Sequence, residues 1–193
     1  MPRLFAGIEL PEAVKDRLSD LSRPLLGARW VDDDDFHLTL RFAGDIEGRL
    51  ARDFTDFLGD VEADAFELRL DGLGTFGGKE PRSIWAAVAP NPALDALQRG
   101  CERAARNAGL SLEPHPFKAH VTIARLRHVL PEDVAHLLGQ IGAFRTAPFP
   151  VKEFVLFSSR PKVGGGPYVV EATYPLRGGY FDMDDDSHGD KWR

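Results

Sequence analysis

The chain has 193 residues, a formal net charge of −6 at pH 7, 43% hydrophobic residues and 28% charged residues. This is the composition of an ordinary globular protein, and the length suits one domain or two lobes that share a core. The acidic balance excludes a protein that coats long duplex nucleic acid, which needs a broad basic face. The single cysteine, Cys101, excludes an intrachain disulfide and favours a cytoplasmic location. No apolar run reaches the ~18 residues of a membrane span.

Hydrophobic periodicity predicts strands and helices along most of the chain. Strands are predicted over residues 3–9, 36–42, 66–70, 83–89, 117–126, 149–158 and 167–176. Helices are predicted from Pro11 to before Pro24, and over residues 47–59, 92–108 and 131–141. Because this order lacks a regular βαβ alternation, the predicted fold class is α+β with antiparallel sheets.

Three polar or glycine-rich stretches are predicted to lie outside these elements. The glycines of residues 72–78 indicate a loop or a hairpin, since no helical pattern follows them. The aspartates of residues 32–35 indicate a solvated loop. Residues 178–193 have no periodicity and are predicted to form a disordered acidic tail, which leaves residues 1–177 as the folded domain.

One pattern occurs in both halves of the chain. His37 and Thr39 lie in the segment Phe-His-Leu-Thr-Leu, and His120 and Thr122 lie in Ala-His-Val-Thr-Ile, 83 residues later. In a strand, residues two apart share a face, so each histidine shares a face with its threonine while the apolar neighbours point into the core. Such polar pairs lose free energy on burial unless they face a cleft or find partners. The repeat therefore predicts one cleft lined by two imidazoles and two hydroxyls.

Two imidazoles that titrate near neutrality suit acid–base chemistry on opposite sides of one phosphorus atom. The hydroxyls of Thr39 and Thr122 can donate hydrogen bonds to phosphate oxygens. Arg125 is a candidate clamp for the developing charge. It lies five residues after His120, which places it on the opposite face of a regular strand, so a bulge or the end of the strand has to redirect it.

Simpler explanations apply to the other histidines. Isolated histidines are usually structural, and we interpret His115, His128, His136 and His188 in this way. A metal site at His37 and His120 is disfavoured because neither motif offers a nearby carboxylate or cysteine on the same face. The sequence therefore predicts neither a metal nor another cofactor.

The chain resembles the two-histidine (2H) phosphoesterase superfamily. Within it, the chain is most similar to the bacterial and archaeal RNA 2′,3′-cyclic phosphodiesterases, also called 2′-5′ RNA ligases. The resemblance spans about residues 3–177 and is carried by the paired motifs, within residues 37–44 and 116–125. Supporting features are the end of the first strand at residues 9–11, Trp30, residues 72–76, Trp85, residues 158–160 and residues 167–168.

This resemblance implies a bilobal fold with pseudo-two-fold symmetry, in which two antiparallel sheets flank a central cleft and the helices lie outside. It implies a hydrolase that opens a 2′,3′-cyclic phosphate to a 2′-phosphomonoester without metal or ATP. His37 is then the general acid that protonates the departing 3′ oxygen, and His120 the general base that activates water. Thr39, Thr122 and Arg125 are expected to hold the phosphate. Some family members also join 2′-5′ linkages by the reverse reaction.

The resemblance also implies partners: RNA ends or small nucleotides with a 2′,3′-cyclic phosphate, with no membrane or obligate protein partner, and a monomeric chain. Phe42 and Tyr168 are candidate contacts to a base or sugar. Two departures concern RNA binding. Asp35 stands where the family often has an amide, and its charge is expected to raise the pKa of His37. The linker over residues 160–162 supplies only Arg160 and Lys162 as basic residues.

Two alternatives stay open. One is a phosphodiesterase for another small substrate, such as a 2′-5′ oligoadenylate or a different cyclic phosphate. The other is a non-catalytic protein that binds RNA ends. Both histidines and both threonines are intact, which favours an enzyme over a binder.

Overall fold

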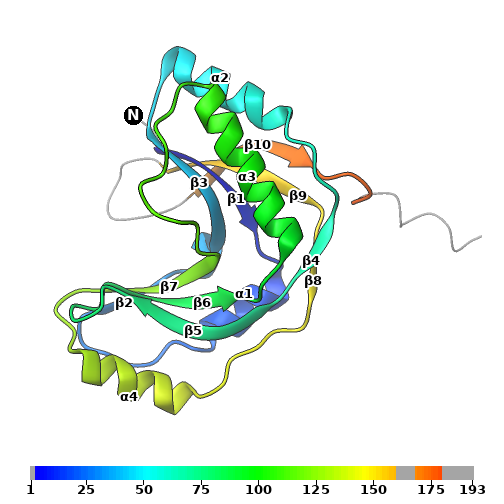
Figure 1. Cartoon of the computed structure of the whole chain (residues 1–193). Helices are drawn as coiled ribbons and strands as arrows, with labels where there is room; N and C mark the ends of the chain where they lie inside the picture. The colour runs from blue at the N-terminus through cyan, green and yellow to red at the C-terminus, as the bar shows by residue number, and fades with distance from the viewer. Residues whose placement is uncertain (1–2, 160–167, 180–193) are drawn as a thin grey trace, which may run out of the picture.

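The computed structural model describes residues 3–159 and 168–179 and has an α+β architecture (Figure 1). Its helices are α1 (Glu12–Ser19), the short 3₁₀ helix η1 (Asp33–Asp35), α2 (Gly48–Gly59), α3 (Pro92–Asn107) and α4 (Pro131–Ile141). Its strands are β1 (Arg3–Glu9), β2 (Ala28–Trp30), β3 (His37–Asp45), β4 (Phe66–Leu68), β5 (Leu70–Phe76), β6 (Ser83–Val88), β7 (His120–Leu126), β8 (Phe149–Val151), β9 (Glu153–Ser159) and β10 (Tyr168–Pro175).

The main sheet consists of two halves joined at one position. Its order in the described residues is β10-β9-β1-β3-β7-β6-β5, with β2 beside β7, and neighbouring strands are antiparallel. The upper half-sheet (β10, β9, β1, β3) meets the lower half-sheet (β7, β6, β5, β2) where Leu38 pairs with Val121. The halves diverge from this junction, so the ribbon is C-shaped with its opening on the left in Figure 1. The predicted pair of antiparallel sheets is confirmed as these two halves.

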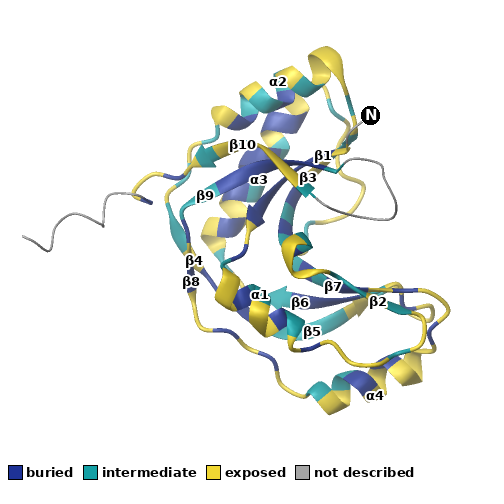
Figure 2. Cartoon of the chain, turned by 180° about the vertical axis from the view of Figure 1, so that it is seen from behind, coloured by how far each residue is buried: buried dark blue, intermediate teal, exposed yellow. Residues whose placement is uncertain are grey.

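The helices lie on the outside of both halves. Helices α2 and α3 cover the upper half-sheet, whereas α1 and α4 lie along the lower half-sheet (Figure 1). The buried face of α3 is formed by Leu94, Leu97 and Cys101, which belong to the same core cluster as Leu38 and Val121. Buried residues follow the strands and the inner faces of the helices in Figure 2. This core therefore covers the face of β3 opposite to His37, and leaves the histidine face uncovered by helices.

Three element predictions are corrected by the structure. The glycine stretch belongs to the β5–β6 hairpin, one of the two predicted possibilities, but it is not outside the strands: β5 runs through it as far as Phe76, where Gly74 pairs with Trp85 and the bulky indole covers the position that a side chain would fill. The predicted strands over 66–70 and 149–158 each divide in two, because β4 and β8 pair with each other in a separate two-stranded sheet. Strand β2 was not predicted, as three residues are too short to show a period.

Some expectations cannot be compared with this structure. The tail over residues 180–193 and the basic residues Arg160 and Lys162 lie outside the described residues. The domain bounds 1–177 therefore stay a prediction. Within the described part of the chain, no helix is long and apolar enough to cross a membrane.

We expect Leu38→Ala to lower the free energy of unfolding by about 2–5 kcal/mol, because it removes a fully buried side chain at the junction of the two half-sheets. Urea denaturation followed by circular dichroism measures this change. The matched control is Leu26→Ala, whose side chain is 96% exposed and which we expect to change stability by less than about 0.5 kcal/mol. Equal effects of the two substitutions would contradict the importance of this junction.

Candidate active site

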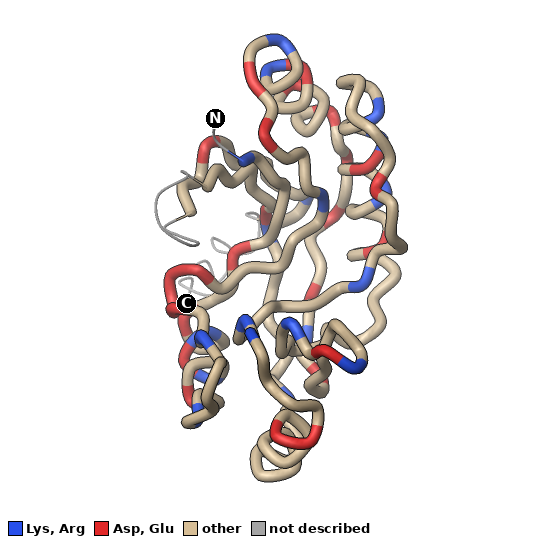
Figure 3. Tube along the Cα trace, turned by 90° about the vertical axis from the view of Figure 1, so that its left-hand side faces the viewer, with Lys and Arg blue, Asp and Glu red and all other residues tan. Residues whose placement is uncertain are grey.

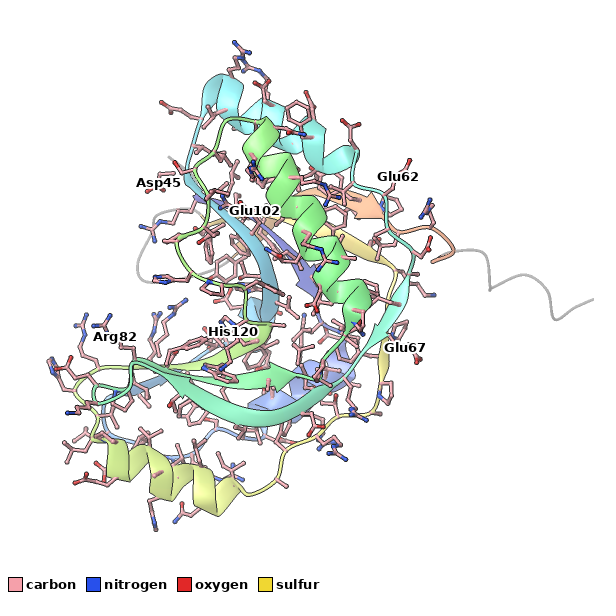
Figure 4. All side chains as sticks on the ribbon, in the orientation of Figure 1. Asp45, Glu62, Glu67, Arg82, Glu102 and His120 are labelled. Atoms are coloured by element: carbon pink, nitrogen blue, oxygen red, sulfur yellow. The ribbon has the colours of Figure 1, made fainter. Side chains whose placement is uncertain are left out.

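The junction of the half-sheets brings the two sequence motifs together. In the antiparallel register set by Leu38 and Val121, His37 lies across from Thr122, and Thr39 lies across from His120. All four polar residues are half-buried, while their apolar neighbours are fully buried on the opposite face. Figure 4 shows His120 on β7, where the upper and lower halves meet. The predicted constellation of two imidazoles and two hydroxyls is therefore present on one face.

Each imidazole is oriented by the backbone two residues before it. Nδ1 of His37 lies 2.8 Å from the carbonyl oxygen of Asp35, and Nδ1 of His120 lies 2.6 Å from that of Lys118. A carbonyl oxygen only accepts hydrogen bonds, so Nδ1 carries the proton in both rings. Nε2 is thereby left as the nitrogen that exchanges a proton with a ligand.

Aromatic rings pack around both histidines. On the upper side, the ring centroid of His37 lies 4.8 Å from Phe5, 4.7 Å from Tyr168 and 5.6 Å from Phe157. These contacts remove water from the ring and hold its orientation.

On the lower side, the ring centroid of His120 lies 4.9 Å from Phe76 and 6.0 Å from Trp85. The Lys118 ammonium lies 4.4 Å from the centroid of the Trp85 ring. The Trp85 ring that packs near His120 therefore also holds a positive charge close to this histidine.

Burial lowers the pKa of His37 from 6.5 to about 4, with smaller lowering contributions from the charges of Arg125 and His120. Burial also lowers the pKa of His120, and the Lys118 ammonium adds to this effect. Both imidazoles are consequently neutral at pH 7 in the free protein. An anion bound between them opposes these effects and favours protonation.

The expected influence of the Asp35 charge on His37 is wrong. Asp35 raises the pKa of His37 through its backbone carbonyl, and burial outweighs that contribution. The Asp35 carboxyl is itself shifted: burial raises its pKa, whereas the backbone amide of Tyr168 and the charge of Arg29 lower it. The Asp35 carboxylate therefore interacts with Tyr168 of β10 and Arg29 of β2. The pKa of His37 responds to the backbone carbonyl of Asp35 and not to its carboxylate.

A β-bulge resolves the orientation of Arg125. On β6, Trp85 pairs with Thr122 and the preceding Ile84 pairs with Ala124, so Ile123 is an extra residue in β7. The inserted residue shifts the alternation by one, and Arg125 returns to the face of Thr122. The bulge that strand alternation required is thus present.

Strand β3 contains the same irregularity after its own motif. Gly7 pairs with Thr39 and Ala6 pairs with Arg41, which leaves Leu40 as the extra residue. Phe42 thereby shares the histidine face, pairs with Phe5 and is 48% exposed. Phe42 and Arg125 occupy equivalent places after equivalent bulges, so the repeat supplies an aromatic ring on one side and a guanidinium on the other.

These residues line one cleft of about 530 Å³. All seven predicted site residues belong to its lining: His37, Thr39, Phe42, His120, Thr122, Arg125 and Tyr168. The lining also contains residues that the sequence patterns did not indicate, among them Arg29, Arg41, Ser83 and Lys118. Figure 3 looks into the opening and shows several Lys and Arg positions along the lower half. Among the described residues, no group of three or more His, Cys, Asp or Glu side chains is arranged to hold a metal ion.

Arg41 is a buried residue whose structural role the sequence did not indicate. Regular alternation places it on the face of His37, but the bulge at Leu40 turns it to the opposite, buried face. Its side chain is 4% exposed, and its Nε lies 2.5 Å from Glu102 of α3. Its Nη1 lies 3.0 Å from Glu113, and Nη2 donates to the carbonyl of Ser111. The guanidinium therefore ties the segment before β7 to strand β3.

Comparison with known proteins identifies the family. Residues 10–162 match the family model of the 2′-5′ RNA ligase superfamily. The chain belongs to this superfamily. Among curated relatives, the RNA 2′,3′-cyclic phosphodiesterase of Geobacillus stearothermophilus is 33% identical over 185 residues, which cover 90% of this chain and 57% of that protein. The Thermus thermophilus protein of the same name is 31% identical over 194 residues and covers 91% of both chains.

Solved structures share the fold. The crystal structure of TT0787 of Thermus thermophilus superposes with a TM-score of 0.77 at 26% identity, over 91% of this chain and 98% of that chain. Escherichia coli LigT complexed with 3′-AMP gives a TM-score of 0.75 at 24% identity, over 92% and 99% of the two chains. The expected 2H phosphoesterase fold is confirmed.

We expect His37 to titrate with a pKa of about 4 in the free protein, and with a higher pKa in the presence of inorganic phosphate. The increase follows because a bound anion stabilises the protonated ring and offsets the charge of Arg125. NMR titration of the histidine ring nitrogens measures both values. A pKa near 6.5 without phosphate, or no response to phosphate, would contradict this account.

We expect Asp35→Asn to leave the pKa of His37 within about 0.5 of its original value, because the hydrogen-bonding carbonyl remains when the carboxylate charge is removed. The same NMR titration tests this variant. A decrease of the His37 pKa by a full unit would show that the Asp35 charge does act on His37, as the sequence suggested.

Proposed function

We propose that this protein is a metal-independent RNA 2′,3′-cyclic phosphodiesterase that produces 2′-phosphomonoester ends. The observation that carries the proposal is the pair of histidines, each with Nδ1 fixed by a backbone carbonyl and Nε2 free, on facing motifs in one cleft. Membership of the 2′-5′ RNA ligase superfamily and the names of the relatives support the same activity. The reaction is then hydrolysis of a strained cyclic ester, in which one histidine accepts a proton from water and the other donates a proton to the leaving oxygen.

In the proposed reaction, Nε2 of His120 accepts a proton from water as the water oxygen attacks phosphorus. The bond between phosphorus and the 3′ oxygen breaks, and protonated Nε2 of His37 gives its proton to that oxygen. The products are a 2′-phosphomonoester and a free 3′ hydroxyl, and solvent exchange restores the two protonation states. The same groups in the same roles, with a 5′ hydroxyl in place of water as the attacking group, form a 2′-5′ linkage and leave the 3′ hydroxyl free.

The surroundings of the two histidines support this division of roles. Lys118 disfavours protonation of His120, as a general base requires. The pKa of His37 is low in the free protein partly because of Arg125, and an anionic phosphate bound to Arg125 offsets that charge. His37 therefore gains its proton together with the substrate. The acid is charged only when there is a leaving group to protonate.

The remaining site residues bind the substrate in this proposal. The hydroxyls of Thr39 and Thr122 donate to the non-bridging phosphate oxygens, and Arg125 stabilises the charge that develops on them. Phe42 and Tyr168 offer aromatic surfaces to the ribose or base, since both line the cleft on the upper side. We further propose that the chain acts as a monomer in the cytoplasm on RNA ends. Size-exclusion chromatography with light scattering tests the oligomeric state.

We expect the purified protein to hydrolyse 2′,3′-cyclic AMP in the presence of EDTA and to release the 2′-phosphate. His37→Ala and His120→Ala are each expected to lower kcat by at least ~100-fold, since each removes one proton-transfer group. Liquid chromatography that separates 2′-AMP from 3′-AMP measures rate and product together. The matched control is His136→Ala, because this exposed histidine of α4 lies outside the cleft lining.

Three results would overturn the proposal. Binding of nucleotide without turnover would indicate a protein that recognises RNA ends. Hydrolysis of a 2′-5′ oligoadenylate in place of the cyclic phosphate would indicate a different phosphodiesterase. Activity that disappears with EDTA would show that the two histidines need a metal ion.

A further inference from the structure

Beyond the bulge in β7, the lower half-sheet carries a polar row across three strands. Arg125 of β7 pairs with Arg29 of β2 on one side and with Ser83 of β6 on the other. Directly opposed residues in antiparallel strands project from the same face, so all three share the face of His120 and Thr122. All three line the cleft. The row is therefore a continuation of the phosphate site along β7.

The position of this row relative to the histidines is set by the strand register. Strand β7 pairs with β3 at Val121 and with β2 at residues 124–126, so β3 and β2 follow one another along the same edge of β7. His37 lies across from Thr122, and Arg29 lies across from Arg125. With the bulge, this is roughly two strand steps, or about 7 Å along β7. That distance is comparable to the step from one phosphate to the next along an RNA strand.

The charges of the row favour an anion. Arg29 and Arg125 lie opposite each other on adjacent strands, so the row brings two like charges to the same face. Asp35 offers a partial counter-charge, since Arg29 lowers the pKa of its carboxyl. Arg125 forms no ion pair with a carboxylate among the residues that the structure describes. Both arginines are exposed, so a ligand reaches them directly.

The cleft is long enough for more than a terminal nucleotide. Its lining follows β7 from Lys118, before the strand, to Arg125 near its end. Within β7 the lining runs from His120 to Arg125, which with the bulge is four strand steps, or about 13 Å. The labelled Arg82 lies toward the outer end of the lower half in Figure 4, next to Ser83 in the chain. An RNA strand that extends from the histidine pair in this direction passes the hydroxyl of Ser83 and the charges of Arg29 and Arg125.

We propose that Arg29, with the hydroxyl of Ser83, binds the phosphodiester one step 5′ of the cyclic phosphate. The inference rests on the proposed function, and it specifies the substrate class: an RNA oligonucleotide, bound through its reacting end and through the next internucleotide phosphate. Arg125 contacts the reacting phosphate and is shared by both positions. A cyclic mononucleotide lacks the second phosphate and uses only part of the site.

The test compares Arg29→Ala with Arg127→Ala, which removes the same charge just past the end of β7, outside the cleft lining. The substrates are 2′,3′-cyclic AMP and a ten-nucleotide RNA that ends in a 2′,3′-cyclic phosphate. We expect Arg29→Ala to lower the ratio of kcat/KM for RNA to kcat/KM for cyclic AMP by about 10-fold, mainly through KM for RNA. Arg127→Ala is expected to leave this ratio within about 2-fold, and Arg29→Lys to restore part of the loss.

A binding measurement separates this inference from the catalytic proposal. Fluorescence anisotropy follows the binding of the same RNA with a 2′-phosphate end, which needs no turnover. We expect Arg29→Ala to weaken binding and to reduce the dependence of log K on log salt by about 0.7, the value for one phosphate contact on single-stranded nucleic acid. Suppose that the wild type hydrolyses neither substrate while Arg29→Ala still weakens RNA binding and lowers its salt dependence. In that case the proposed function fails and the second phosphate site stands.

Two outcomes would overturn the inference. An equal loss on cyclic AMP and on RNA would place Arg29 at the reacting phosphate, or would show that it acts through Asp35. Unchanged RNA binding and an unchanged ratio in Arg29→Ala would show that Arg29 only balances the acidic residues of the following loop.

Discussion

The pairing of Leu38 with Val121 is the contact on which the active-site geometry depends. It joins the two half-sheets, and both side chains are fully buried in the main core. Because side chains alternate along a strand, burying this pair turns the polar residues on either side toward the opposite face. A slip of one residue in either strand would place the histidine–threonine pairs in the core, where their unpaired polar groups would be costly. Hydrophobic burial thus determines where the polar groups of the cleft lie.

The two halves then differ in what they add to a common plan. Both motifs use the carbonyl two residues upstream to orient the imidazole, and both are followed by a bulge of one residue. The side chain that the bulge redirects is Phe42 in one half and Arg125 in the other. Pseudo-symmetry of the backbone therefore produces a cleft with an aromatic side and a cationic side. This asymmetry suits a nucleotide, which has an aromatic base at one end and a phosphate at the other.

The electrostatics of the cleft favour an incoming anion. The chain has a net charge of −6, yet the face beside His120 gathers Arg125, Arg29 and Lys118. In the free protein this charge, together with burial, disfavours protonation of the histidines. In the proposed reaction a bound phosphate offsets this charge, so that substrate binding and protonation of His37 are coupled. The overall charge of a protein and the charge of its site are separate quantities.

The sequence by itself determined the class of secondary structure and the two histidine–threonine pairs. The period of two around His37 and His120 indicates a strand, because each motif places a polar pair on one face and apolar residues on the other. Most helices were equally clear, because α3 keeps an apolar stripe over its length and begins at a capping Asn91. These features are local, and local rules of spacing are sufficient to predict them.

Only the tertiary structure decided the features that depend on a partner strand. The bulge at Ile123 is visible only through its pairing with β6, and Arg29 gains meaning only because β2 lies beside β7. Breaks in the strands around residues 69 and 152 arise because the chain changes sheets, which no periodicity records. The pKa of His37 likewise depends on burial by rings from β1, β9 and β10. Spacing along the chain fixes which face a residue occupies only as far as the next bulge. Beyond that point the neighbours across the sheet decide the face, and they also decide how burial and nearby charges shift a pKa.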